Sequence, residues 1–315
     1  MAAERLLELV LSLHASIRDA VVEACRRKPP AQLAQRAGDE GDTIYAIDRV
    51  AEEALVRGLR KLPKAESICV IAEGLGARET DCRWRMLVDP IDGTRGLMYQ
   101  KRSAWILTGV ASNSGAATPL SDVELAVQTE IPLVKQHLCD QLWAIRGKGA
   151  QARRWNRLTR RHERITLRRS AARSVEHGFA TIARFFPGAR ELLGAIDDEV
   201  MRALIDPEPG RAACFEDQYA CTGGQLYELM AGHDRFVADV RPLVDPGGLC
   251  CHPYDLCTEL IAREAGVIIT DPAGESVASP MDLTTDVAWV GYANQALRRS
   301  IEPVLQGVLR RRKLL

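Results

Sequence analysis

Several features that mark a specialised class of protein are missing from this sequence. Its 42 lysines and arginines balance its 42 aspartates and glutamates, so the formal net charge is zero and no overall field favours nucleic acid or a membrane surface. No apolar run approaches the ~20 residues that a membrane-spanning helix requires. The N-terminal segment mixes acids and arginines with its leucines, unlike a signal peptide. We therefore expect a cytoplasmic protein that binds neither nucleic acid nor membrane.

The cysteines also lack the pattern of a disulfide-rich or zinc-binding domain. There are nine, scattered and odd in number, and no paired C-x-x-C lies near histidines in zinc spacing. Cys250 and Cys251 are adjacent, and nothing near them in the sequence indicates a lowered thiol pKa. We expect buried thiols in a reducing compartment.

What is present indicates an ordinary layered protein. The 315 residues are 46% apolar and 27% charged, enough for one large domain or two fused lobes. Hydrophobic periodicity predicts helices at 3–27, 44–62, 191–204, 222–231, 255–265 and from 294 onward, and strands at 67–71, 85–88, 105–111, 123–128, 141–145, 236–239, 267–270 and 287–290. The basic stretch 153–164 has few aliphatic residues. We place the boundary there, between an α+β lobe (1–160) and an α/β lobe (161–315).

The segment 88–94, VDPIDGT, carries the strongest chemical signal. Asp89 and Asp92 can supply oxygen ligands to a hard cation such as Mg²⁺, and the Ile91 carbonyl can supply another. The backbone N–H groups of Gly93 and Thr94 are suited to holding an anion at a helix start. A solvated Asp-Pro/Asp-Gly turn explains the same residues if they are taken alone.

Three further acids stand at the edges of apolar elements. Glu73 follows a predicted strand, Asp255 opens a predicted helix, and Asp48 lies within another. Each has an ordinary reading: Glu73 as a loop carboxylate, Asp255 as a helix cap, and Asp48 as an ion-pair partner of Arg49 or Arg57.

Taken in order, these residues resemble the inositol monophosphatase family. This family belongs to the Mg²⁺-dependent, lithium-sensitive phosphatase superfamily that includes fructose-1,6-bisphosphatases. The resemblance runs from about residue 40 to the end of the chain, and its parts are Asp48, Ala72-Glu73-Gly74, the segment 88–94, Arg146 to Ala150, Ala220 to Gly224, Pro253-Tyr254-Asp255, Glu264 to Val267, and Gly291 to Asn294.

The resemblance implies a fold, a cofactor and a set of roles. The fold would be the layered αβαβα sandwich of that superfamily, and the assembly a homodimer. Two or three Mg²⁺ ions would be held by Glu73, Asp89, the Ile91 carbonyl, Asp92 and Asp255. Thr94, hydrogen-bonded to Asp48, would help to deprotonate the attacking water. Substrate would be held by Gly93, Thr94, Cys221, Thr222 and Asp239.

The sequence also departs from the family pattern. Gly74 stands where relatives usually carry a second glutamate, which weakens the case for a third Mg²⁺. The usual W-D-x-A-A motif is replaced by residues 254–258, YDLCT, and the link 240–254 is longer than usual. Asp239 is shorter than the glutamate that contacts the sugar ring in inositol-hydrolysing relatives. His252 is interpreted as a structural, hydrogen-bonded residue, with substrate contact as the alternative.

These features predict Mg²⁺-dependent hydrolysis of a small phosphate monoester. We also expect that free inositol phosphate is not the best substrate. Two alternatives stay open. One is a catalytically weakened relative that binds a phosphorylated metabolite, and the other is a phosphatase acting on 3′-phosphoadenosine 5′-phosphate.

Overall fold

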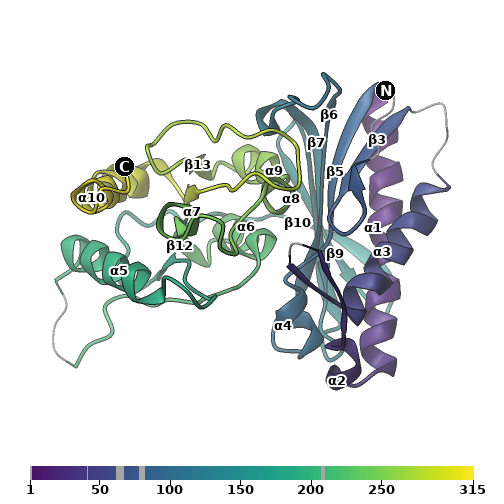
Figure 1. Ribbon diagram of the computed structural model, residues 1–315, viewed down its shortest axis with the longest axis horizontal. Helices are drawn as coiled ribbons and strands as arrows, with labels where there is room; N and C mark the ends of the chain where they lie inside the picture. Colours follow the sequence, from purple (N-terminus) through teal and green to yellow (C-terminus); the bar gives the residue numbers. More distant parts are fainter. Residues whose placement is uncertain (1, 41, 62–66, 78–81, 207–209) are drawn as a thin grey trace.

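Two main β-sheets, the helices that cover them and a separate two-stranded hairpin form the architecture of the described part of the chain (Figure 1). The structure is a computed structural model, and it describes residues 2–40, 42–61, 67–77, 82–206 and 210–315. The large sheet has eight strands in the order β10-β9-β8-β7-β6-β5-β3-β4. In that order, their bounds are Arg161–Ile165, Ala150–Asn156, Leu138–Ile145, Val123–Ile131, Ala104–Ser112, Trp84–Asp92, Ile68–Ala72 and Gly76–Ala77. All neighbours in this sheet are antiparallel except β3 and β5.

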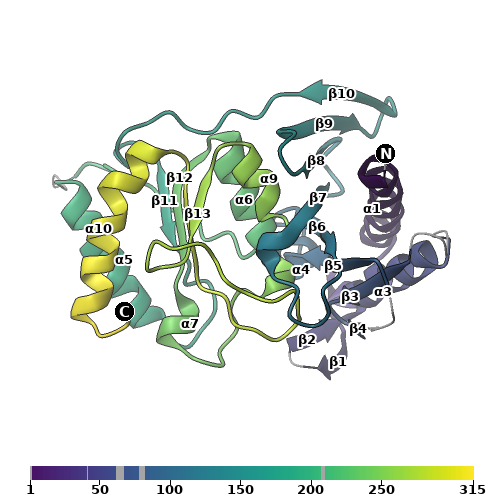
Figure 2. The same cartoon turned by 90° about the horizontal axis from the view of Figure 1, so that it is seen from above.

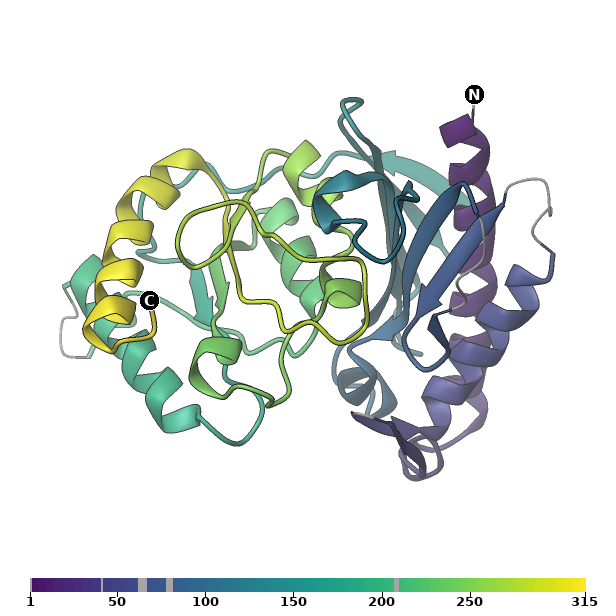
Figure 3. The same cartoon turned by 45° about the horizontal axis from the view of Figure 1, so that its top comes forward.

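The small sheet has four strands in the order β11-β12-β14-β13. Their bounds, in that order, are Phe179–Ile182, Asp234–Asp239, Trp289–Tyr292 and Ile268–Thr270. A separate hairpin consists of β1 (Arg36–Glu40) and β2 (Asp42–Tyr45). A long segment before β14 reaches from the small sheet to the loop that follows β6 of the large sheet, where Met281 N donates to Thr118 O at 2.8 Å (Figure 3).

Helices form the outer and middle layers of the molecule. Helices α1 (Ala2–Arg27) and α3 (Ala46–Leu59) cover one face of the large sheet; α6 (Thr222–Ala231) and α9 (Glu259–Glu264) lie between the sheets; α5 (Arg190–Leu204) and α10 (Gln295–Arg311) cover the small sheet (Figure 2). The short helices are α2 (Pro30–Leu33), α4 (Thr94–Met98), η2 (Leu120–Asp122), α7 (Arg241–Val244) and α8 (Pro253–Leu256). The order helix, sheet, helix, sheet, helix confirms the predicted layered αβαβα fold.

The apolar pattern of the sequence explains this layering. Helix α1 buries Leu6, Val10, Leu13, Ile17 and Val21, which recur every three or four residues and so form one face toward the large sheet. Strand β5 is buried at all nine positions because helices cover both faces of its sheet.

The basic stretch 153–164 differs from the sequence prediction. The basic stretch 153–164 forms most of β9 and β10, which pair as a hairpin, so the large sheet continues past the expected boundary at residue 160. Strand β9 is only partly buried and β10 is mostly exposed, and both are rich in arginine, so aliphatic periodicity does not detect them. The division into two lobes itself stays a prediction.

The predicted helix 255–265 is also wrong as a single element. The structure has α8 and α9 instead, separated at Cys257 and Thr258. Thr258 is fully buried, and its hydroxyl donates to Gln128 Oε1 at 3.1 Å. This side chain–side chain bond accompanies a local break in the helical path.

The expectation that all cysteines are free thiols is corrected as well. Cys69 and Cys82 form a disulfide between the start of β3 and the residues before β5, with their Cα atoms 5.7 Å apart. The other seven cysteines are free. Among the described residues, no helix is both long and apolar enough to cross a membrane.

Candidate metal centre

A bulge in β5 turns two aspartates toward the same place. Asp89 pairs with Leu107 of β6, but Asp92 pairs with Trp105, so the register shifts by one residue between them. In a regular strand, side chains three positions apart point to opposite faces. The extra residue in the bulge restores them to one face. Pro90 lies within the bulge, where a missing N–H donor is tolerated.

Helix α8 brings in the third carboxylate. Asp255 is the third residue of this helix, and its Oδ2 accepts a hydrogen bond from His252 N at 2.7 Å. One oxygen therefore helps to cap the helix, as an ordinary aspartate does. Ligand oxygens of Asp89, Asp92 and Asp255 lie within 4.8 Å of one another.

Glu73 joins this group through the pairing of β3 with β5. The two strands are parallel, with Ala72 opposite Val88, and Glu73 N donates to Val88 O at 3.2 Å. The next position along each strand is therefore Glu73 and Asp89, which lie side by side at the ends of the paired strands. Asp255 lies close to the Asp89/Asp92 pair, and Glu73 follows the strand paired with β5. Their roles as metal ligands stay predictions.

Burial and mutual repulsion make these carboxylates unusually weak acids. Burial first, and then the charge of Asp255, raises the pKa of Asp92 to about 8. The pKa values of Glu73 and Asp89 are raised well above the usual range, first by burial and then by neighbouring carboxylates. Ionised carboxylates this close are unfavourable, because they are buried and because they repel one another. A bound divalent cation offsets both the cost of burial and the repulsion. The all-oxygen donor set fits a hard ion such as Mg²⁺.

Asp48 and Thr94 form a pair beside this cluster. Thr94 Oγ1 donates to Asp48 Oδ1 at 2.7 Å and lies 3.0 Å from Ile91 O. Asp48 Oδ2 accepts a further hydrogen bond from Tyr45 N at 2.7 Å, which fixes the carboxylate at the start of α3. Burial raises the pKa of Asp48 to about 6, and the hydrogen bonds from Tyr45 and Thr94 oppose this rise.

Helix α6 holds Asp92 from the other half of the molecule. Gly223 N donates to Asp92 Oδ2 at 2.6 Å, and the Cys221 thiol donates to Asp92 O at 3.3 Å. Cys221 is buried, and its sulfur also accepts from Gly224 N as the cap of α6. Gly93 has φ +93, and a Cβ there would lie 3.0 Å from the Cys221 sulfur, so both the conformation and the space require glycine. Substrate contacts of Cys221 and Thr222 stay predictions.

Asp239 is held by a partner that sequence reasoning missed. Its carboxylate is fully buried and receives two hydrogen bonds from Arg241, 2.8 Å from Nε and 2.5 Å from Nη2. Arg241 also donates to Leu249 O at 3.0 Å and so fixes the 240–254 link. The i, i+2 spacing of Asp239 and Arg241 is the only signal in the sequence for this pair. Contact between Asp239 and substrate stays a prediction.

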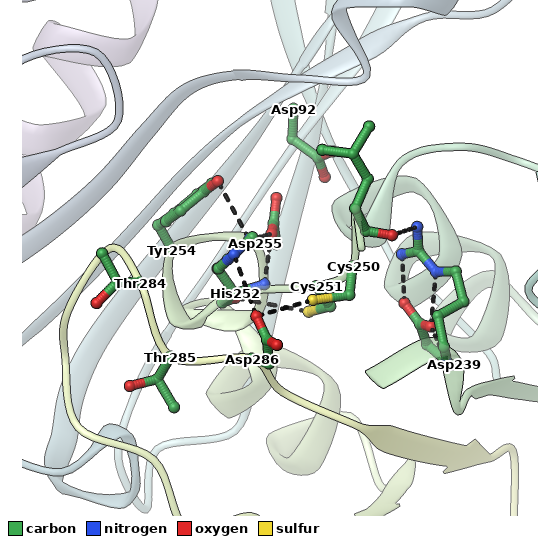
Figure 4. A network of polar contacts seen from close by, with 12 residues as sticks. Asp92, Asp239, Cys250, Cys251, His252, Tyr254, Asp255, Thr284, Thr285 and Asp286 are labelled. Atoms are coloured by element: carbon green, nitrogen blue, oxygen red, sulfur yellow. Dashed lines mark hydrogen bonds and ion pairs between the residues drawn. The ribbon is translucent and has the colours of Figure 1, made fainter. Parts of the chain in front are cut away.

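His252 lies between two carboxylates at the edge of the centre (Figure 4). Its Nδ1 is 3.7 Å from Asp255 Oδ2, and its Nε2 is 3.7 Å from Asp286 Oδ1. The ring stacks on Tyr254 with centroids 5.2 Å apart. The interpretation of His252 as a hydrogen-bonded structural residue fits these contacts, but its partner Asp286 carried no signal in the sequence.

Solved structures share this fold over nearly the whole chain. A hypothetical protein from Pyrococcus horikoshii, described as having similarities for inositol-1 monophosphatase, aligns with a TM-score of 0.67 and 17% identity, covering 96% of this chain and 98% of that one. The extragenic suppressor protein suhB from Bartonella henselae aligns with a TM-score of 0.67 and 18% identity over the same shares. A gene product described as an inositol monophosphatase–fructose 1,6-bisphosphatase gives 0.68 and 17%, again covering 96% and 98%.

Sequence comparison adds nothing to this likeness, since no protein-family model and no curated protein matches the chain. The structural neighbours therefore establish the architecture, and the chemistry is argued from the residues themselves. The chain has the fold of the inositol monophosphatase-like proteins that its DPIDGT motif led us to expect.

Proposed function

We propose that this protein hydrolyses a small phosphate monoester with the help of Mg²⁺. The observation that carries the proposal is the approach of Asp89, Asp92 and Asp255 within 4.8 Å, with Glu73 next to Asp89 at the ends of the paired strands β3 and β5. We assign one ion to Glu73, Asp89 and the Ile91 carbonyl, and a second to Asp89, Asp92 and Asp255. Bound Mg²⁺ ions activate water and stabilise the charge that develops on the phosphoryl oxygens.

The chain's own residues supply the proton transfer. The Thr94 hydroxyl, held by Asp48, accepts a proton from the attacking water as it passes its own to the Asp48 carboxylate. A pKa of about 6 for Asp48 suits this role, because a general base works best when its pKa is near the ambient pH. The Gly93 and Thr94 amides hold the phosphate, and Thr222 contributes at the start of α6.

We also propose that free inositol 1-phosphate is not the preferred ester. The Asp239 carboxylate is engaged by Arg241 and buried, so it presents little to a sugar ring. The longer 240–254 link, fixed through Leu249, alters the mouth of the site. The idea is wrong if inositol 1-phosphate turns over faster than sugar, nucleotide and amino-alcohol phosphates.

A nucleotide ester with a second phosphate, such as 3′-phosphoadenosine 5′-phosphate, is the second candidate substrate. One observation favours it. Arg95 follows Thr94 directly, and its guanidinium lies 5.0 Å from the centre of the Phe186 ring, which Arg241 approaches from 5.5 Å. The Arg95 cation and the Phe186 ring suit an anionic, aromatic ligand, whereas the Arg241 charge is balanced by Asp239.

The test is hydrolysis of p-nitrophenyl phosphate and the metabolite panel with and without Mg²⁺. We expect Mg²⁺-dependent release of phosphate that Asp89→Asn abolishes and Li⁺ inhibits. Inertness of the folded, Mg²⁺-loaded protein toward every ester would favour the alternative, a protein that only binds a phosphorylated metabolite. A homodimer is part of the same proposal, and light scattering on the purified chain tests it.

A further inference from the structure

A second group of metal-ligating side chains lies beside the carboxylate centre. Cys250, His252 and Asp286 each place one ligand atom within 4.8 Å of the other two. Figure 4 shows His252 between Asp255 on one side and Asp286 on the other, with Cys250 nearby. Cys250 and His252 are partly exposed and Asp286 is exposed, so an ion from solvent can reach them.

An isolated β-bridge builds this group from two distant segments. Cys251 pairs antiparallel with Val287, and Val287 N donates to Cys251 O at 2.8 Å. The flanking residues His252 and Asp286 therefore lie opposite each other. Cys250 and His252 are two positions apart along the chain, so they project to the same side, whereas Cys251 between them is buried.

Two of the three separations between ligand atoms are close to the edges of a zinc tetrahedron. Cys250 Sγ lies 3.2 Å from Asp286 Oδ1, and His252 Nε2 lies 3.7 Å from the same oxygen. Zinc bonds of ~2.3 Å to sulfur and ~2.0–2.1 Å to nitrogen and oxygen place tetrahedral ligand atoms about 3.3–3.5 Å apart. The Asp286 oxygen therefore lies close to the tetrahedral distance from both other ligand atoms, and the Cys250 sulfur and the His252 ring, which lie within 4.8 Å of each other, can close on one ion by side-chain adjustment.

The imidazole ring is already oriented for this role. Its Nδ1 faces Asp255 Oδ2 at 3.7 Å and the Tyr254 hydroxyl at 3.3 Å, so a proton on Nδ1 leaves the Nε2 lone pair directed toward Cys250 and Asp286. A histidine that binds zinc through one nitrogen usually directs the other N–H to a carboxylate or a similar acceptor.

We propose that Cys250, His252 and Asp286 form a Zn²⁺ site, separate from the all-oxygen Mg²⁺ centre and joined to it through the His252–Asp255 contact. Sulfur, nitrogen and oxygen donors select zinc over magnesium. Binding releases the Cys250 thiol proton to solvent as the sulfur–metal bond forms. Three protein ligands leave the fourth position to water. Phosphatase activity is not needed for this site to exist.

The experiment titrates the full-length protein with Co²⁺, a spectroscopic substitute for Zn²⁺, in saturating Mg²⁺ so that the carboxylate centre is occupied. We expect one equivalent of Co²⁺ to produce a thiolate-to-metal charge-transfer band that Zn²⁺ then displaces. Cys250→Ser should remove the band, and Asp286→Ala should weaken Co²⁺ affinity at least about tenfold. Cys214→Ser is the matched control, because Cys214 is another partly exposed thiol, bonded to Gly178 O, and its loss should leave the band intact.

Two results would overturn the proposal. One is a band that survives in Cys250→Ser, and the other is Co²⁺ binding with no thiolate band in the unaltered protein. The Mg²⁺-induced rise in unfolding temperature is measured on every variant. A variant that keeps this rise but loses the band has lost the zinc site alone, whatever the outcome of the phosphatase assay.

Discussion

The Thr94 hydroxyl lies 2.7 Å from Asp48 Oδ1, although the two residues are 46 positions apart in the sequence. The contact joins α4 to α3 next to the carboxylate cluster. If this pair removes the proton from water, Thr94→Ala should lower kcat by about 10²–10³-fold with little change in KM, because the contribution appears in the transition state.

Thr94→Ser is the matched comparison, since it keeps the hydroxyl and should retain most of the turnover. Steady-state kinetics on the preferred ester measures both variants. A pure loss of affinity in Thr94→Ala, with kcat unchanged, would refute the assigned role.

The repulsion among buried carboxylates predicts an unusual stability effect. Asp89→Asn removes one charge while its side-chain oxygen can still accept from Ile91 N, which donates to Asp89 Oδ1 at 2.8 Å. Without divalent ions the variant should be more stable than the parent by about 1 kcal/mol, or ~2 °C in unfolding temperature. It should also lose the Mg²⁺-induced stabilisation.

Thermal unfolding with EDTA and with Mg²⁺ measures both effects. Asp198→Asn serves as the control, because Asp198 is exposed and pairs with Arg202 on α5. That variant should keep the full Mg²⁺ response. Equal Mg²⁺ stabilisation of Asp89→Asn and the parent protein would place the ion elsewhere.

Glu52 occupies the space that a side chain at position 74 would need. A Cβ on Gly74 would lie 2.3 Å from Glu52 Oε1, and Gly74 has φ +74. Gly74→Ala should therefore destabilise the protein by about 1 kcal/mol from the backbone conformation alone, with an added cost for displacing Glu52.

A double-mutant cycle separates the two contributions. Gly74→Ala made in the Glu52→Ala background should cost only the backbone part, as measured by urea unfolding. Identical costs in both backgrounds would mean that Glu52 moves aside freely.

The burial of His14 leads us to expect a lower free energy of unfolding in mild acid. It is fully buried between the hydroxyls of Thr108 and Thr129, and burial, followed by the charge of Arg18, lowers its pKa to about 3. The unfolded chain takes up a proton near pH 6.5, but the folded protein does not. Stability is therefore complete above pH 6.5 and falls toward pH 3. Between pH 7.5 and 5.0 the loss from this group is about 2 kcal/mol.

Urea unfolding at both pH values checks the sign. His14→Gln should reduce the difference between the two pH values by about that amount, whereas His137→Gln, which changes an exposed histidine, should leave it unaltered. A parent protein that is equally stable at both pH values, or the same pH dependence in His14→Gln, would contradict the assignment.

Sequence reasoning succeeded where local pattern and tertiary structure agree. The stripe of α1 and the ten residues of α6 follow from helical periodicity. The segment 88–94 indicated its own chemistry because both aspartates stand at the end of an apolar strand. It could not indicate the bulge that places them on one face, because that depends on the register with β6.

The parts of the site that the sequence did not predict depend on contacts between distant segments. Asp286 and His252 are brought together by one isolated bridge, and nothing near residue 286 distinguishes it from any loop aspartate. Arg241 is near Asp239 in sequence, but its burial comes from packing against Phe185, 4.3 Å from the ring centre. The hairpin of β9 and β10 was not predicted because its sequence is rich in arginine and poor in aliphatic residues, which resembles a linker.

The hydrogen bond from Gly223 N to Asp92 also has a consequence for biosynthesis. Strand β5 leaves the ribosome well before α6, and Asp255 follows later still. A nascent chain that has finished the large sheet therefore carries an unfinished cation pocket, with Asp92 unsupported and one carboxylate absent. If the cluster binds a cation as proposed, binding must wait until Asp255, in the last third of the polypeptide, has been translated.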